Sequence, residues 1–410
     1  MTAVLVSHPH AGAVSVAAAQ ALERHGQLAR YATGIVANEG SLSGQLGHCV
    51  SRYRAVATNR IVGGISASHL SSHPFAEVAA RVVGECGNLL GQRGAKYAAL
   101  FFGHDLAVAA GSWPRETDAV YAYEDAALAT FRKAKRLKNI ACVWDLPLPS
   151  HQSLERIWDE EFRRWPGAMG SRPHAEPAWK IARKNEELQL ADVVSVASAH
   201  TRRSVEELGV TKPIAVAPYG FPLESFQPKA NPNQGPLTVL SVGTHDLRKG
   251  TPYLLEAWRQ AGIRDARLKL VGPLKLTSAF LQQYEGLFEH LPHVPKAELE
   301  AHYQSADLLA FPTLGDGFGL VIQEAMTCGT PVATTRMGGG PECIDHGVDG
   351  WILPERNLEA LVEHFRFCAQ NRDAVHEVGR QARQKAESRN WKDAGDVFVA
   401  ELGHALARIN

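Results

Sequence analysis

The sequence FPTLGDGFGLVIQEAMTCGTPVA, residues 311–333, decides the fold of this chain. The apolar run that ends at Phe311 reads as the end of a buried strand. Three glycines then mark a tight loop: Gly315, Gly317 and Gly319. A helical pattern begins at Leu320, Gly329 suits the position just past the helix end, and Pro331 starts the next strand. The stretch therefore predicts the strand, loop, helix and strand of a βαβ unit in a parallel sheet.

The glycine loop and the start of the helix predict a phosphate site. The first N–H groups of a helix have no partner within the helix, and the helix dipole places positive charge beside them. Asp316 precedes the helix, and Glu324 lies just over one turn inside it. Carboxylates repel phosphate, so we expect both to accept hydrogen bonds from hydroxyl groups of a ribose or another sugar. The alternative is a βαβ unit whose helix simply has a polar start.

The same stretch resembles the donor-binding signature of retaining family-four glycosyltransferases, which have the GT-B fold. That signature reads E-G-F-G, a hydrophobic residue, x-x-x and E-A-M-x-x-G-x-P-V, and this chain has Asp316 at the first glutamate. The resemblance implies that Glu324 holds the donor ribose and that Asp316, one methylene shorter than glutamate, contacts the transferred sugar. It also implies that the N–H groups of Phe318, Gly319 and Leu320 hold the diphosphate.

Four residues after a predicted strand over 237–242 are further candidates for donor binding: Gly243, Thr244, Arg248 and Lys249. They resemble the family's G-R-x-x-x-x-K-G element, whose cations neutralise the donor diphosphate. Lys249 matches the lysine of that element, whereas Thr244 stands where arginine is usual. We expect the neighbouring Arg248 to supply the missing charge.

Two other places resemble parts of the family's donor site. Gly12 follows the first predicted strand, where the family often carries a glycine pair at the donor phosphate. A plain surface loop is the alternative there. His293 and Val294 precede a predicted helix, at the position where the family frames the nucleobase through backbone contacts. All three residues are therefore candidates for donor binding.

The loop DLPLPSH, residues 145–151, follows the predicted strand 140–144. In open α/β sheets, ligands gather at the carboxyl ends of the strands. The family usually presents a histidine at the end of this strand. Asp145 and His151 are therefore both candidate catalytic residues. In the alternative reading, Asp145 caps a turn and His151 caps the following helix.

The composition is that of an ordinary globular chain. The length of 410 residues predicts two or three domains, and the 43 basic residues balance the 43 acidic ones, which argues against a nucleic-acid binder. Six scattered cysteines and the lack of a basic leader predict the reducing cytoplasm. The basic end of a helix predicted over 124–137 reads as a solvated face, with contact to the inner membrane surface or to an acidic acceptor as the alternative.

The order of elements predicts an α/β chain of two Rossmann-like, doubly wound parallel-sheet domains. Residues 1–217 read as the N-terminal domain, 218–236 as a linker rich in Pro and Asn, 237–388 as the C-terminal domain and 389–410 as a last helix. In the GT-B fold, the two domains face each other across a cleft, the first binds the acceptor, the second binds the nucleotide sugar, and the last helix crosses back to the first. Helical periodicity also predicts a helix over 276–288, whereas the weak periodicity of residues 38–95 indicates helices and loops.

Together these features predict a retaining glycosyltransferase. It would move a sugar from a donor such as a UDP- or GDP-sugar to a hydroxyl group of a glycan, lipid-linked or small-molecule acceptor. The chain contains no Asp-x-Asp pair, so cationic side chains and a helix dipole are expected to hold the diphosphate without a metal or other cofactor. The alternative is a non-catalytic nucleotide-sugar-binding protein or partner subunit, favoured by Thr244, Asp316 and the single Gly12.

Overall fold

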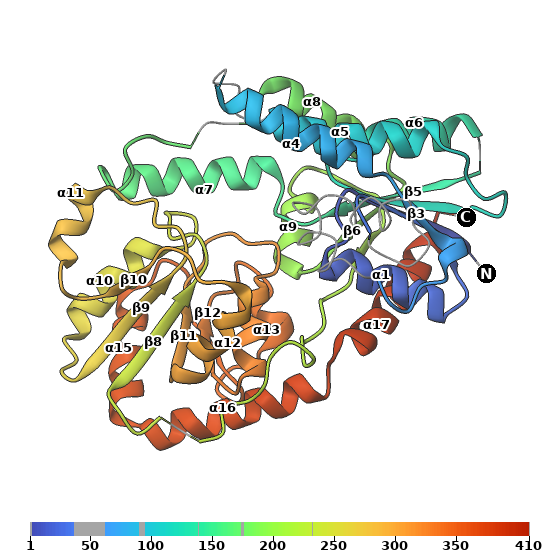
Figure 1. Cartoon of the computed structure of the whole chain (residues 1–410). Helices are drawn as coiled ribbons and strands as arrows, with labels where there is room; N and C mark the ends of the chain where they lie inside the picture. Colours follow the sequence, from blue (N-terminus) through green and yellow to red (C-terminus); the bar gives the residue numbers. More distant parts are fainter. Residues whose placement is uncertain are drawn as a thin grey trace.

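The computed structural model describes residues 2–36, 62–89, 95–137, 139–173, 176–231 and 233–409. These residues form two α/β domains, the N-terminal one on the right of Figure 1 and the C-terminal one on the left. A seven-stranded sheet in the order β3-β2-β1-β4-β5-β6-β7 forms the first core, and a six-stranded sheet in the order β10-β9-β8-β11-β12-β13 forms the second. Neighbouring strands of both sheets run parallel. The predicted pair of doubly wound parallel sheets is confirmed.

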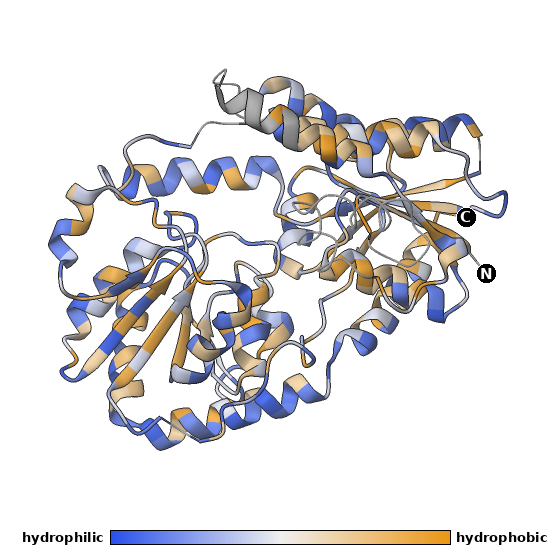
Figure 2. Ribbon diagram, viewed as in Figure 1, coloured by the Kyte–Doolittle hydropathy of each residue, from blue (hydrophilic) through white to orange (hydrophobic). Residues whose placement is uncertain are grey.

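The N-terminal domain has mostly apolar strands between two layers of helices. Its strands are β1 (Val4–His8), β2 (Leu28–Thr33), β3 (Leu70–Ser72), β4 (Ala119–Tyr123), β5 (Ala141–Leu146), β6 (Val193–Val196) and β7 (Ile214–Val216). Its helices are α1 (Ala13–Arg24), the 3-10 turn η1 (Ala67–His69), α4 (Pro74–Leu89), α5 (Ala95–Ala110), α6 (Leu128–Leu137), α7 (His151–Arg164), α8 (Ala178–Leu190) and α9 (Ala199–Glu206). Parallel strands covered on both faces are expected to be apolar along their length, and Figure 2 shows hydrophobic strands beneath helices with hydrophilic outer faces.

The C-terminal domain repeats this arrangement. Its strands are β8 (Leu237–Val242), β9 (Ala266–Val271), β10 (Glu289–Leu291), β11 (Leu308–Phe311), β12 (Val332–Thr334) and β13 (Trp351–Ile352). The helices that follow in the chain are α10 (Thr251–Ala261), α11 (Ser278–Leu281), the 3-10 turn η2 (Gln282–Tyr284), α12 (Lys296–Ser305), α13 (Leu320–Thr327), α14 (Gly340–Cys343), α15 (Leu358–Gln370), α16 (Arg372–Glu387) and α17 (Trp391–Ala407). No helix within the described ranges has both the length and the apolar character that crossing a bilayer requires.

Helix α17 leaves the C-terminal domain and lies beside α1 of the N-terminal domain (Figure 1). Asn390 and Asp393 form a capping box at its start, which satisfies backbone N–H groups that the helix itself leaves unpaired. Its apolar side chains Phe398 and Leu402 are buried in the same hydrophobic cluster as Val4 of β1. The end of the chain therefore ties the two domains together.

Helix α7 makes a second connection, because its apolar face packs into the core of the C-terminal domain. Ile157 lies in the main hydrophobic cluster of that domain. Glu161 is fully buried and accepts hydrogen bonds from the Tyr253 hydroxyl at 2.9 Å and from Arg356 Nε at 2.6 Å. The predicted N-terminal range 1–217 thus includes one helix that packs on the other domain.

The helix predicted over 124–137 begins later, at Leu128. Asp125 has a left-handed φ of 67°, so the chain turns there before the helix starts. The Glu187 carboxylate, from α8, accepts hydrogen bonds from the N–H groups of Asp125 and Leu128 at 2.8 and 3.1 Å. A cap supplied from so far along the chain left no local signal in the sequence.

The prediction of one helix over 276–288 is wrong, because this stretch contains α11 and η2 in succession and then leads into β10. Gly286 has a φ of 76° and turns the chain toward the strand. The described part of the range 38–95 contains the edge strand β3 as well as helices and loops. The prediction for residues 38–61 and 90–94 lies outside the described residues.

Candidate active site

A cavity of about 580 Å³ lies between the two domains. Strand-end residues from both sheets line it: His8 of β1, Tyr123 of β4, Asp145 of β5, Val242 of β8 and Phe311 of β11. The strand order reverses between β1 and β4 in the first sheet, and between β8 and β11 in the second. Ligands of doubly wound sheets bind at such reversals, so this cavity is the candidate active site.

The N-terminus of α13 opens into the cavity. Gly319 is the N-cap and has a φ of 92°, in the left-handed region that favours glycine. Phe318, Gly319 and Leu320 all line the cavity. The first N–H groups of a helix have no partner within it, and they carry the positive end of the dipole. The structure therefore places the predicted anion-binding loop in the cavity.

Gly317 is required by the close approach of the N-terminal domain. A Cβ atom there would lie 1.7 Å from the Pro147 carbonyl oxygen. The Gly317 carbonyl accepts hydrogen bonds from the hydroxyl groups of Ser198 at 2.6 Å and Thr201 at 3.2 Å. The start of α9 thereby holds the glycine loop of the other domain in place.

Two cations and a carboxylate meet on the C-terminal side of the cavity. The Lys249 ammonium forms an ion pair with Asp316, and Arg248 Nη1 lies 3.9 Å from Asp316 Oδ1. Arg248 Nη1 also donates to the Gly315 carbonyl at 2.5 Å. Burial lowers the pKa of Lys249, and the Asp316 carboxylate opposes that shift. Asp316 therefore compensates for positive charge in the cavity, and Gly243 and Thr244 lie on the same lining.

Asp145 lines the cavity from the N-terminal side. Asp145 is 6% exposed, and the Tyr121 side chain partly opposes the effect of this burial on its pKa. Burial raises the pKa of Asp145 to about 7. The carboxyl group can therefore exchange a proton near neutral pH, which suits a group that acts on sugar hydroxyls.

His151 is the first residue of α7 and does not line the cavity. It is half-buried, and burial, followed by the positive charge of Lys184, lowers its pKa. The alternative in which His151 caps the helix is wrong, since Ser150 is the N-cap and its hydroxyl accepts from the Ser153 N–H at 3.3 Å. The structure brings Asp145, and not His151, to the strand ends.

Glu324 and the two nucleobase candidates lie outside the lining of the cavity. The Glu324 carboxylate accepts a hydrogen bond from the Tyr303 hydroxyl at 2.7 Å, and burial raises its pKa. His293 is exposed, and Val294 packs against a hydrophobic cluster of the C-terminal domain. Gly12, by contrast, lines the cavity as the N-cap of α1.

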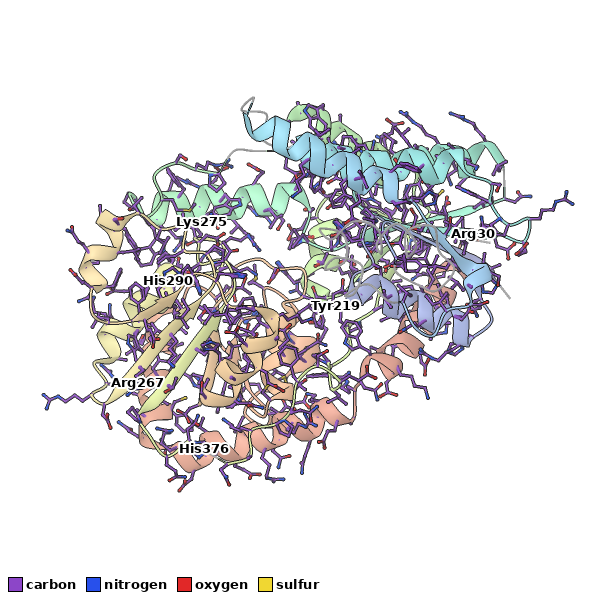
Figure 3. The ribbon with its side chains drawn as sticks, viewed as in Figure 1. Arg30, Tyr219, Arg267, Lys275, His290 and His376 are labelled. Carbon is purple, nitrogen blue, oxygen red and sulfur yellow. The ribbon has the colours of Figure 1, made fainter. Side chains whose placement is uncertain are left out.

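His8 and Tyr219 line the cavity, although the sequence did not single them out. The His8 ring packs edge-on against Tyr123, with ring centroids 4.3 Å apart, and burial lowers the pKa of His8 to about 3, which keeps it neutral. Tyr219 lies between the two domains (Figure 3), and its ring centroid is 4.9 Å from that of Phe318. His8 stands at the end of the first predicted strand, and this position could have identified it as a candidate site residue.

Residues 224–385 match the family described as glycosyl transferases group 1. Most of the C-terminal domain is thus similar to this family. The predicted resemblance to family-four glycosyltransferases is thereby confirmed. The matched residues of this group 1 domain include the glycine loop, Lys249 and Asp316.

Among curated relatives, the D-inositol 3-phosphate glycosyltransferase of Pseudarthrobacter chlorophenolicus is 30% identical over 215 residues, which is 48% of this chain and 51% of the relative. The enzyme of the same name from Mycobacterium tuberculosis strain F11 is 31% identical over 124 residues, or 29% of this chain and 25% of the relative. The chain thus spans about half, or less, of the length of these relatives.

Solved structures resemble the whole chain, which includes both the group 1 domain and the N-terminal domain. Sucrose-phosphate synthase from Thermosynechococcus elongatus has a TM-score of 0.63 and 16% identity, over 100% of both chains. Anabaena Alr3699/HepE in complex with UDP-glucose has a TM-score of 0.60 and 16% identity, over 99% of this chain and 100% of the other. These likenesses show that the chain has the GT-B fold.

Proposed function

We propose that this chain is a retaining glycosyltransferase that moves a sugar from a nucleotide-sugar donor to a hydroxyl group of an acceptor. One observation carries the proposal: the cavity combines a helix N-terminus and two cations on the group 1 domain with a carboxyl group on the opposite domain. The negative charge of a diphosphate complements the cations and the helix N-terminus of the C-terminal domain. The hydroxyl groups of a sugar can donate hydrogen bonds to the carboxyl group on the N-terminal domain. The solved structure of HepE with UDP-glucose supports a nucleotide sugar as the donor.

The positive groups of the cavity act on the bond that breaks. As the sugar leaves, negative charge develops on the diphosphate oxygen, and the Lys249 ammonium and the α13 dipole stabilise that charge more than they stabilise the bound donor. In a front-face retaining reaction, the departing phosphate oxygen takes the proton of the acceptor hydroxyl. Asp145 then positions hydroxyl groups, which is itself a large rate effect.

Retention of anomeric configuration is the first expected result. Proton NMR of the earliest product should show the same anomer as the donor sugar, because donor and acceptor meet on one face of the sugar ring. An inverted anomer would refute the retaining mechanism.

Activity is expected to persist in the presence of a chelator. Lys249, Arg248 and the helix dipole supply the positive charge that a divalent ion supplies in metal-dependent transferases. Transfer rates measured with excess EDTA and with added Mg²⁺ should agree within about twofold, well below the effect of losing a charged catalytic group. Loss of activity in EDTA that Mg²⁺ restores would show that a metal is needed.

Glu324→Gln is expected to weaken donor binding by about 10- to 100-fold, because a hydrogen bond to a charged group contributes roughly 1.5–3 kcal/mol. Glu324 does not line the cavity, but it lies one helical turn beyond the lining residue Leu320 on α13. In this proposal its carboxylate reaches the ribose at that end of the cavity and keeps its bond from Tyr303. Calorimetry with the donor measures the change, and Tyr303→Phe is the matched control, since it removes the partner and leaves the carboxylate. An unchanged donor affinity for Glu324→Gln would exclude the ribose role.

A non-catalytic nucleotide-sugar-binding protein is the second candidate. The ion pair between Lys249 and Asp316 favours it, because Asp316 reduces the charge available to the diphosphate. Both candidates bind the donor, and only the transferase consumes it. The release of nucleoside diphosphate from the donor, measured with an acceptor or with water alone, distinguishes the two candidates, because only the transferase releases it.

A further inference from the structure

Three strand ends of the N-terminal sheet place a row of side chains along one wall of the candidate active site. His8 and Tyr123 directly follow the last pair of residues in the ladder between β1 and β4. Tyr123 pairs in turn with Asp145 of β5. Because side chains alternate between the two faces of a sheet, residues at paired positions share one face. His8, Tyr123 and Asp145 therefore stand side by side, and all three line the cavity.

One nitrogen of the His8 ring is engaged by the turn after β1. Its Nδ1 atom lies 2.6 Å from the carbonyl oxygen of His10 and 3.1 Å from the His10 backbone nitrogen. A single nitrogen cannot donate to the first atom and accept from the second at the same time. An unprotonated nitrogen would repel the carbonyl oxygen at 2.6 Å, so Nδ1 carries the proton and donates to it. In a neutral ring, Nε2 then has a free lone pair.

The Nε2 atom of His8 is open to the cavity. It forms no hydrogen bond with any residue that the structure describes. It is also not one of the polar side-chain atoms that lie buried without a partner in the described part of the chain. Burial and the neighbouring His10 lower the pKa of His8 to about 3, so the ring stays neutral. Nε2 can therefore accept a hydrogen bond from a hydroxyl group in the cavity.

Two hydrogen-bond acceptors thus flank an aromatic ring. Strands β1 and β5 are separated by β4, so they lie roughly 10 Å apart. The Tyr123 ring lies between them and packs against the edge of the His8 ring, with centroids 4.3 Å apart. A sugar ring has hydroxyl groups around its edge and C–H groups on its faces. Its edge can donate to His8 and Asp145 while one face packs on Tyr123.

We propose that His8 is an acceptor-binding residue: its Nε2 and the Asp145 carboxylate accept hydrogen bonds from two hydroxyl groups of one acceptor sugar. A third hydroxyl group of that sugar attacks the donor. The bond from the donor sugar to the diphosphate breaks, the new glycosidic bond forms, and the proton of the attacking hydroxyl goes to the departing phosphate oxygen. The inference rests on the proposed transfer reaction and names the side chains that hold its acceptor.

The protonated nitrogen of His8 is measured first, by ¹⁵N NMR of protein with labelled histidine. We expect Nδ1 to carry the proton and Nε2 to be unprotonated between about pH 6 and pH 8, because these values are far above the pKa of the ring. The spectrum of His8→Asn assigns the signal. A protonated Nε2 would overturn the inference, since that atom could not accept a hydrogen bond.

Transfer is then measured with the nucleotide sugar that the wild type binds best. The acceptor probes are water, methanol and the methyl glycosides of glucose, galactose and mannose. We expect at least one glycoside to accept the sugar faster than methanol at equal concentration. His8→Asn keeps an N–H group near the position of Nδ1 and lacks Nε2, so it should lower transfer to that glycoside by about tenfold or more. Hydrolysis of the donor in water should change less than about twofold, because water has no second hydroxyl group for His8 to hold.

Two further variants separate binding from folding. The side chain of His8→Gln carries a carbonyl oxygen near the position of Nε2, so this variant should regain most of the transfer that His8→Asn loses. His404→Asn is the control, because His404 is exposed on α17 and lies outside the cavity lining. Its transfer rate should equal that of the wild type. Thermal unfolding checks that each variant folds.

Four outcomes of the transfer assay would overturn the inference. His8→Asn transfers as fast as the wild type, or it loses hydrolysis as much as transfer, or His8→Gln is impaired to the same extent, or the wild type prefers no glycoside to methanol. A wild type that releases no nucleoside diphosphate from any donor would instead contradict the proposed function.

Discussion

Lys249→Ala is expected to lower the transfer rate by about 10²- to 10³-fold, the loss found when one charge-stabilising group is removed from an active site. The variant should also weaken donor binding, but less than it lowers kcat, because negative charge on the diphosphate grows as the sugar leaves. Steady-state kinetics with the donor separate the effects on kcat and KM. Lys275→Ala is the control, since Lys275 is exposed and outside the cavity lining (Figure 3).

The ion pair with Asp316 allows a second control. Removing Lys249 leaves a nearly buried carboxylate with its main partner gone, which destabilises the fold. The double variant Lys249→Ala, Asp316→Asn should regain thermal stability and stay as inactive as the single variant. If activity returned together with stability, the role of Lys249 would be structural.

Asp145→Asn is expected to lower the transfer rate more than about 100-fold, a loss of the size attributed to a positioned acid or base. Donor affinity should stay within a few-fold, because the diphosphate is held by the opposite domain. His151→Ala, at the start of α7, is the control, and its rate should stay close to that of the wild type, since His151 does not line the cavity. Near wild-type transfer by Asp145→Asn would remove Asp145 from the active site.

The pH profile gives an independent check on Asp145. Burial raises the pKa of this carboxyl to about 7. The carboxylate is the form that accepts hydrogen bonds from sugar hydroxyls, so kcat/KM should rise with pH through about 7 in the wild type. Asp145→Asn should lack this inflection. The midpoint of this rise is expected at a pH of about 7, the pKa of the buried carboxyl group. A wild-type kcat/KM that does not change between about pH 6 and pH 8 would contradict this assignment.

The sequence predicted the donor side of the cavity because its signals are local. The strand β11, the glycine loop and α13 follow one another in the chain, and Gly319 has the left-handed φ that a tight helix start requires. Lys249 and Arg248 follow β8 in the same way. Each of these residues lies in the segment that follows one strand, so the hydrophobic pattern located the segments, and the resemblance to the family-four signature singled out the residues within them.

The N-terminal side of the cavity depends on the order of strands in the sheet, which could not be predicted from the sequence. His8, Tyr123 and Asp145 meet because β1, β4 and β5 are neighbours in the sheet, although the chain between β1 and β4 is more than a hundred residues long. The packing of α7 on the other domain is likewise a long-range effect, fixed by Glu161 and its partners Tyr253 and Arg356. Local periodicity carries no information on such partners.

Calorimetry with a panel of UDP- and GDP-sugars, on the wild type and on Lys249→Ala, tests the site most directly. We expect at least one nucleotide sugar to bind one site per wild-type chain and to bind the variant at least tenfold more weakly, as the loss of a charged hydrogen bond worth roughly 1.5–3 kcal/mol requires. Wild type that binds none of the panel, or a variant that binds as tightly as the wild type, would contradict a donor site in this cavity.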